Sequence, residues 1–284
     1  MSVYLVADSG CDLPEDSSIR PCSEIVPLKI QVPDCGEFID DIKLDTVALA
    51  NKINSQKLVS HSACPSVEDY AKIMEAHDET VIITLSSELS GSFNSARVAK
   101  NMVLEKNPDK KICVLDSKSA SAGELSIALF LSKLIGENAT FDVIVEKGKS
   151  YISKMRTLFV LEDISNLVKN GRMSKVKGTI ASVLSIHPIL SDNGNGEIVS
   201  YKIVRGLRNS LSELVEVIAL QSAKAATKSL TLTLSHCNCK ERAEEMRVAI
   251  LSKCASVGEV IISRTLGLST LYANNGGIIA AFSL

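Results

Sequence analysis

Tryptophan is absent from this 284-residue sequence, and aromatic residues make up only 4% of it. Platforms that stack single-stranded nucleic acid need exposed aromatic rings, so this scarcity argues against that class of protein. An excess of one charge is missing as well, because 31 Lys and Arg residues are matched by 33 Asp and Glu residues. Proteins that bind nucleic acid or anionic membrane surfaces normally carry a basic excess, so we expect neither partner.

Long apolar runs and an export signal are also lacking. The first residues, MSVYLVADSG, do not combine a basic segment with the long apolar stretch of a secretory signal peptide. No apolar run approaches the length of a membrane span. We therefore expect a soluble, cytoplasmic protein with no membrane span.

Paired cysteine motifs are missing although the chain has eight cysteines. A structural zinc site usually needs two closely spaced pairs of ligands. The tightest grouping is His236-Cys237-Asn238-Cys239, and no second pair lies near it in the sequence. We therefore expect reduced thiols and no metal site.

Apolar strands and helical segments alternate through the first half of the chain. Strands are expected at 3–9, 24–32, 80–86 and 111–117. Four helices are expected: one from Asp45, one from Ser66, one over 92–106 and one over 122–136. The second begins with a capping box formed by Ser66 and Asp69. The apolar side of the third consists of Ala96, Val98, Ala99, Val103 and Leu104. This order predicts a parallel sheet covered by helices on both faces.

The second half has a different pattern. Helices are expected at 141–155, 164–170 with a left-handed end at Asn170-Gly171, 177–186, 206–220 and 240–253. Strands are expected at 157–161, 229–236, 259–265 and 276–284, with a hairpin formed by 188–192 and 197–204. The sequence thus predicts an α/β protein with an N-terminal parallel α/β sandwich domain (1–155) and a C-terminal α+β domain (156–284).

Polar residues follow three strands of the first half at the point where each strand ends. These are Asp8-Ser9, Ser86-Ser87 and Asp116-Ser117. The carboxyl ends of parallel strands line the ligand crevice of an open α/β sheet, although each pair could equally cap the helix that follows. Taken together, the three pairs favour a binding site.

A serine-rich turn, LSSELSGSFNSA, leads from one of these strands into a helix. Free amides at the helix start, the hydroxyls of Ser90 and Ser92, and the small Gly91 could hold an anion without a formal positive charge. Ordinary helix capping explains the same residues equally well. A second polar stretch, Asn170-Gly171-Arg172, offers a guanidinium for a phosphate or a carboxylate, or simply a solvated Arg after a helix.

No catalytic motif stands out. Four histidines are present (His61, His77, His187 and His236), but there is no G-x-S-x-G elbow to mark an activated serine. An aspartyl nucleophile at Asp8 would need a nearby acid, and Gly10 stands where a D-x-D motif would place it. The residues therefore favour a binding protein for an amphiphile with an anionic head, and an ester or phosphate hydrolase using Ser90 or Asp8 remains the alternative.

Several stretches, in order, resemble the DegV family of bacterial lipid-binding proteins over nearly the whole chain. They are VADSGCDLP, FIDD (38–41), SACPS (62–66), LSSELSGSFNSA (85–96), VLDSKSASAGEL (114–125), LVKNGRMSKV (167–176) and IHPIL (186–190). The resemblance implies two domains with a lipid tunnel between them, one buried long-chain fatty acid, and no other cofactor. It also implies a non-catalytic protein that presents the carboxylate to a fatty acid kinase.

The resemblance implies specific site residues as well. The carboxylate contacts fall on Ser62 and on Ser90, beside Gly91 and Ser92, and the kinase-linked Arg falls on Arg172. Where the family usually has a C-terminal His in an H-x-G-P-G context, this chain has Tyr272, which donates a hydrogen bond but does not titrate near neutral pH. That departure leaves open a carrier of a different amphiphile. Further residues expected to line the site are Asp8, Ser9, Asp116, Ser117 and His187.

Overall fold

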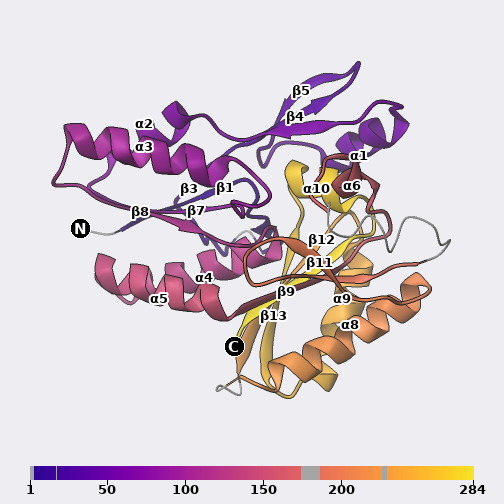
Figure 1. The fold of residues 1–284 in the computed structure, drawn as a ribbon. Coiled ribbons are helices and arrows are strands. Elements are labelled where there is room, and N and C mark those ends of the chain that lie inside the picture. Colours follow the sequence, from indigo (N-terminus) through magenta and orange to yellow (C-terminus); the bar gives the residue numbers. More distant parts are fainter. Residues whose placement is uncertain (1–2, 17, 174–185, 226–228) are drawn as a thin grey trace.

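A computed structural model describes residues 3–16, 18–173, 186–225 and 229–284, which form three sheets with helices packed around them (Figure 1). Of the helix predicted at 177–186, all but Ile186 lies outside the described residues. Within the described part of the chain, no helix has both the length and the apolar character needed to cross a bilayer.

The first sheet is four-stranded and parallel, in the order β3-β1-β7-β8. One face packs on α2 and α3, and there Val6 and Ile82 share a buried cluster with Tyr70 (Figure 1). The other face packs on α4 and α5, and there Leu5 shares a cluster with Leu125. The predicted parallel sheet with helices on both faces is confirmed. The bounds are β1 (Tyr4–Asp8), β3 (Glu24–Val26), β7 (Glu79–Thr84), β8 (Lys111–Asp116), α2 (Val67–Ala76), α3 (Ser92–Lys106), α4 (Ala122–Gly136) and α5 (Phe141–Lys154).

Local sequence signals place several helix ends correctly. Asp45 caps α1 (Thr46–Ser55) by accepting hydrogen bonds from the amides of Val47 and Ala48, and Ser66 forms the predicted capping box of α2. α6 (Ser165–Lys169) is followed by Gly171 in a left-handed conformation (φ 78°). The predicted apolar side of α3 is wrong at Val98, which is 37% exposed because it lies off the stripe formed by Ala96, Ala99 and Val103.

The second sheet is mixed and seven-stranded, in the order β11-β10-β9-β14-β12-β13-β2. The hairpin predicted around residues 193–196 is present as the antiparallel pair β10 and β11. β2, from the first half of the chain, pairs with β13, and the predicted domain boundary near 155 stays a prediction. The bounds are β2 (Leu13–Pro14), β9 (Met155–Val160), β10 (Ile189–Asp192), β11 (Ile198–Lys202), β12 (Leu230–His236), β13 (Val257–Arg264), β14 (Ile278–Ser283), α8 (Leu207–Ser222) and α9 (Lys240–Lys253).

Helix α4 joins the two large sheets. It contacts β1 and β7 of the first sheet on one side and β9, β12 and β14 of the second sheet on the other. Every residue from Ala122 to Ala128 is buried, so the sequence AGELSIA needs no solvent-facing side. α8 and α9 contact strands of the second sheet, α8 packing on β9 and α9 on β12 and β13.

A third, small sheet with the order β5-β4-β6 lies beside α1 and α10 (Figure 1). The segment predicted as one strand at 24–32 is split, because β3 belongs to the first sheet and β4 (Lys29–Val32) to the third. The third sheet also contains β5 (Gly36–Ile39) and β6 (His61–Ala63). The sequence reading missed α10 (Gly267–Ala273), a single short helix whose start carries no capping side chain of its own.

Candidate functional site

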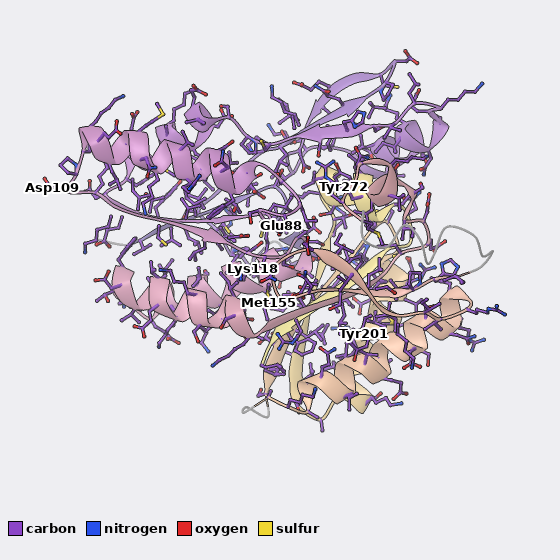
Figure 2. The ribbon with its side chains drawn as sticks, viewed as in Figure 1. Glu88, Asp109, Lys118, Met155, Tyr201 and Tyr272 are labelled. Atoms are coloured by element: carbon purple, nitrogen blue, oxygen red, sulfur yellow. The ribbon has the colours of Figure 1, made fainter. Side chains whose placement is uncertain are left out.

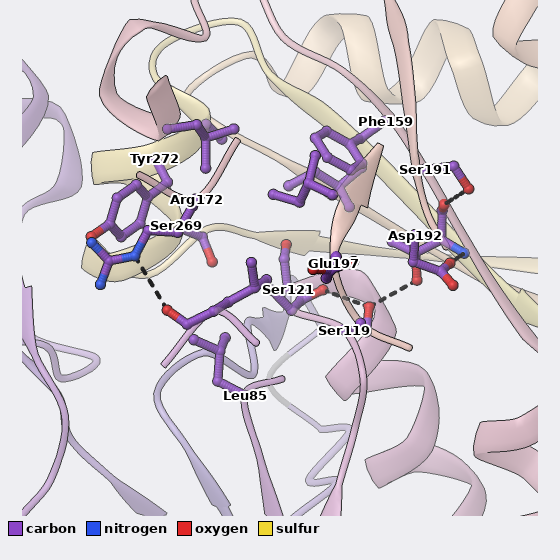
Figure 3. A pocket seen from close by; sticks show the side chains of 18 of the residues that line it. Leu85, Ser119, Ser121, Phe159, Arg172, Ser191, Asp192, Glu197, Ser269 and Tyr272 are labelled. Carbon is purple, nitrogen blue, oxygen red and sulfur yellow. Dashed lines mark hydrogen bonds between the residues drawn. The ribbon is translucent and has the colours of Figure 1, made fainter. Parts of the chain in front are cut away.

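A cavity lies where loops of the first sheet meet β9, β14 and α10 (Figure 3). It contains about 760 Å³ of atom-free space, part of which is the open solvent of its mouth. The exposed surface of its walls is mainly apolar, with two aromatic rings, Phe159 and Tyr272. Three charged residues, Lys118, Asp192 and Glu197, also line it. The apolar lining consists of Leu85, Leu89, Ala120, Phe159, Leu161, Leu167, Ile198, Leu268, Ala273 and Ile279.

The hydroxyl groups along the inner wall are already engaged by the protein. Ser119 and Thr157 share a hydrogen bond of 2.8 Å between their hydroxyls, and Ser191 donates to the carbonyl of Thr157 at 2.9 Å (Figure 3). Ser121 donates to the buried carboxyl of Asp12. Because these hydroxyls already have partners, the inner wall suits an apolar guest.

The cavity has a polar end at Arg172 and Tyr272, and Figure 2 shows Tyr272 on α10. The Tyr272 hydroxyl lies 2.9 Å from the hydroxyl of Ser62, which does not itself line the cavity. The Arg172 guanidinium lies 5.4 Å from the centre of the Tyr272 ring (Figure 3). Arg172 donates to the carbonyls of Leu89 (3.2 Å) and Asn170 (2.8 Å), which fix its position. The structure thus brings Ser62, Tyr272 and Arg172 together, although 210 residues separate the first two in sequence.

An outer hollow adjoins this end and shares Leu89 and Arg172 with the cavity. Ser90 and Gly91 line the hollow, and the Ser90 hydroxyl lies 3.0 Å from the Ser92 hydroxyl. A Cβ atom at Gly91 would lie 3.0 Å from Cys64 Sγ, so the absence of a side chain lets the turn approach SACPS closely. The serine-rich turn therefore flanks the polar end. Its role in ligand binding stays a prediction.

The polar residues at the strand ends hold the loops that carry the lining. Asp8 accepts from the amides of Gly10 and Leu85, both at 2.9 Å, and Ser9 donates to Asp40 at 2.8 Å. Further along, Asp116 accepts from the Ser87 hydroxyl at 2.6 Å and Ser117 donates to the carbonyl of Ser119 at 3.0 Å. Four such residues, Asp8, Ser9, Asp116 and Ser117, thus support the wall from behind, and direct ligand contact by them stays a prediction.

His187, the remaining predicted site residue, is half-buried beside the cavity wall. Its Nδ1 lies 3.4 Å from the carbonyl of Leu161, a lining residue, and its own carbonyl accepts from Ser210 at 2.6 Å. A role for His187 in binding also stays a prediction. Among the described residues, no group of His, Cys, Asp and Glu has the arrangement of a metal site.

Four buried acids, which the sequence reading did not group, lie between the first sheet and α10. They are Asp8, Asp12, Asp40 and Glu124. Burial raises the pKa of Asp8 and Asp40 to about 6 and that of Asp12 to about 7, and it raises the pKa of Glu124 well above its usual range. A Cβ atom at Gly10 would lie 2.7 Å from Glu124 Oε1 and 2.9 Å from Asp8 Oδ1, so this packing requires glycine there.

These acids predict an unusual dependence of stability on pH. Their pKa values in the folded protein exceed the ordinary 3.8 and 4.5, so the folded state binds more protons, and stability falls as pH rises toward 7. Each such group changes the free energy of unfolding by up to about 1.4 kcal/mol per pH unit. His236 has the opposite effect below pH 6.5, because burial lowers its pKa and the unfolded state then binds more protons than the folded state. We expect a higher melting temperature at pH 5.5 than at pH 8, and Asp12→Asn should narrow the difference. A higher melting temperature at pH 8 would contradict this assignment.

Sequence reasoning missed most of the cavity wall, and the strands show why. In β14, Ile279 and Ala281 face the cavity side, whereas Ile278, Ala280 and Phe282 face the core beneath α8 and α9. β9 alternates in the same way, with Phe159 on the cavity side. In β9, Thr157 shares the cavity side with Phe159 but has only a neutral hydroxyl, and the residues of β14 on the cavity side up to Ala281 are apolar, so no charged residue of either strand marked the side that borders the cavity.

Comparison with known proteins gives consistent matches over the whole chain. A family model described as an uncharacterised protein of the DegV family matches residues 2–281. A DegV domain-containing protein of Streptococcus gordonii is 34% identical over 289 residues, covering 100% of both chains.

Two solved structures resemble this one closely. A DegV family protein from Ruminococcus gnavus, described with vaccenic acid, has a TM-score of 0.90 at 35% identity and covers 99% of each chain. The Fak B3 protein of the Streptococcus pneumoniae fatty acid kinase, loaded with linoleic acid, has a TM-score of 0.87 at 32% identity. That match covers 100% of this chain and 99% of the pneumococcal chain.

Proposed function

Because the chain belongs to the DegV family, we propose that it is a binding protein that buries one long-chain fatty acid in the cavity between its sheets. The carboxylate lies at the polar end, where Ser62, Tyr272 and Arg172 converge. The observation that carries the proposal is the contrast along the cavity. Most of its exposed surface is apolar and the hydroxyls of Ser119, Thr157 and Ser191 are engaged, whereas the Tyr272 hydroxyl and the Arg172 guanidinium lie close together at one place on its wall.

The energetics of this arrangement favour an amphiphile with a long tail. Burial of an acyl chain contributes roughly 0.8 kcal/mol per methylene, so a chain of ordinary length outweighs the cost of desolvating one carboxylate that meets donors. The head group is held by the neutral hydroxyls of Ser62 and Tyr272, and the Arg172 guanidinium, which lies over the Tyr272 ring, is left to meet an arriving phosphoryl group. By the family resemblance, Tyr272 stands where the usual His would be, and it offers a hydroxyl donor in place of an imidazole.

The proposal includes presentation of the carboxylate to a fatty acid kinase rather than catalysis by this chain. The Fak B3 protein, by its description a part of a fatty acid kinase, supports this role. Within the described residues, the Ser90 hydroxyl contacts Ser92 rather than a histidine, which does not favour the hydrolase alternative. Location in the cytoplasm is part of the proposal, and the eight cysteines without disulfides support it.

Titration of delipidated protein with oleate in a calorimeter tests the proposal. We expect saturation at one site, and Ser62→Ala and Ser90→Ala should each weaken binding about tenfold, the effect of losing one hydrogen bond to a charged group. Ser252→Ala, on the exposed surface of α9, is the matched control and should bind oleate like the wild type. If both site variants keep wild-type affinity, the carboxylate lies elsewhere.

The same titration separates a fatty acid carrier from a carrier of a different amphiphile, and an assay of turnover tests the hydrolase alternative. A carrier of a different amphiphile would bind oleate weakly and a lipid with another head group tightly. A hydrolase would turn over generic esters or phosphates, and Ser90→Ala or Asp8→Asn would abolish that turnover.

A further inference from the structure

Helix α10 forms one wall and the polar end of the cavity, yet it is only seven residues long. Leu268, Ser269 and Ala273 line the cavity, and Tyr272 supplies the hydroxyl that meets Ser62. The position of this helix therefore sets the distance between the two hydroxyls at the polar end.

The sequence of α10 cannot fix that position by itself. Helices this short are unstable in isolation, and the residue before α10, Leu266, offers no capping side chain. The amides at a helix start need acceptors from elsewhere. Here the acceptors are two aspartates from the first forty residues of the chain.

Asp40 and Asp12 accept these amides. Asp40 Oδ1 accepts from Gly267 at 2.6 Å and Oδ2 from Leu268 at 2.9 Å, while Asp12 accepts from Leu266 at 2.7 Å. Asp40 is fully buried and separated from these partners by more than 220 residues of chain. Bonds from both carboxyl oxygens of Asp40 thus fix the start of α10 in place.

Asp40 is itself held rigidly. The Ser9 hydroxyl donates to Asp40 Oδ2 at 2.8 Å and accepts from the amide of Leu28, whose carbonyl in turn accepts from the amide of Asp40. The start of α10 is also tightly packed, because a Cβ atom at Gly267 would lie 2.6 Å from the Ile30 side chain. A small change at Asp40 would therefore move α10 as a unit.

We propose that Asp40 is a positioning residue for lipid binding, which aligns Tyr272 with Ser62 by holding the start of α10. This inference rests on the proposed function. Asp40 does not line the cavity, so it acts on the head group through Tyr272 and leaves the aliphatic wall unchanged. Ser9, expected from sequence at the ligand, acts in the same assembly by orienting Asp40.

The test is a double-mutant cycle of Asp40→Asn and Tyr272→Phe, read by calorimetric titration with oleate and with methyl oleate. The Asn amide replaces one acceptor oxygen, so we expect Asp40→Asn to weaken oleate binding about tenfold. Methyl oleate, which has the same tail without the carboxylate, should lose less than about threefold. In the Tyr272→Phe background, Asp40→Asn should cost less than about twofold further, because the aligned hydroxyl is already gone.

Two further variants complete the test. Asp69→Asn changes a carboxyl at the start of α2 in the same way and should leave oleate binding unchanged. If Asp40→Asn does not fold, Ser9→Ala takes its place, because it keeps both bonds from α10 to Asp40. We expect Ser9→Ala to weaken oleate binding more than methyl oleate binding, with a smaller loss of affinity than Asp40→Asn.

Additive effects in the cycle, or equal losses of affinity for oleate and methyl oleate, would overturn the inference. If the wild type still binds oleate saturably in that case, the proposed function stands and only the role of Asp40 is lost. If the wild type does not bind oleate, the proposed function and the role of Asp40 both fail.

Discussion

Replacing Ile198 by Trp is expected to lower the affinity for oleate by at least about 100-fold, because the loss of four or more buried methylenes costs about 3 kcal/mol. Ile198 lines the cavity from β11, the edge strand of the seven-stranded sheet, and is only half-buried. An indole at this position can extend into the cavity without opening the packed core beneath α8. Calorimetric titration of delipidated protein measures the change, and the melting temperature checks the fold.

A matched control lies directly beyond the same strand. Ile203 is 46% exposed, and Ile203→Trp adds the same bulk outside the cavity. We expect this variant to bind oleate like the wild type. Wild-type affinity in Ile198→Trp would mean that the acyl tail does not occupy this cavity.

Replacing Arg172 by Ala is expected to reduce phosphorylation of bound oleate by the kinase of the same organism about 100-fold. The guanidinium lies between the cavity and the outer hollow, fixed by the carbonyls of Leu89 and Asn170. A phosphoryl group arriving at the carboxylate from the hollow would meet its planar donors. Oleate affinity should change by less than about threefold, because Ser62 and Tyr272 remain to hold the carboxylate.

Acyl phosphate formation, followed with labelled ATP, measures this effect. Arg172→Lys keeps the charge but loses the paired donors, so its rate should fall between those of the wild type and Arg172→Ala. Arg97→Ala, an exposed change on α3, is the control and should leave the rate unchanged. If Arg172→Ala is phosphorylated at the wild-type rate, Arg172 has no part in the transfer.

Much of the fold follows from local signals in the sequence. The capping residues Asp45 and Ser66 mark helix starts, and Gly171 marks a helix end, because each of these features depends on neighbouring residues alone. The parallel sheet follows from apolar strands alternating with helices. The long apolar helix α4 is buried between two sheets, as its composition requires.

The features that the sequence did not reveal all depend on contacts between distant segments. α10 lacks a local cap and is held by Asp12 and Asp40, so no pattern around residues 267–273 predicts it. The family resemblance implied that Ser62 and Tyr272 each contact the ligand, but not that their hydroxyls contact each other. That contact depends on the position of α10. Likewise, the strand expected at 24–32 divides between two sheets because its two parts find different distant partners.

Mass spectrometry of a denatured lipid extract tests the central claim most directly. Protein purified under native conditions should release a straight-chain fatty acid, close to one molecule per chain, and protein with Ile198 replaced by Trp should release far less. A wild-type extract without any fatty acid, from protein that also takes up no added oleate, would contradict the account.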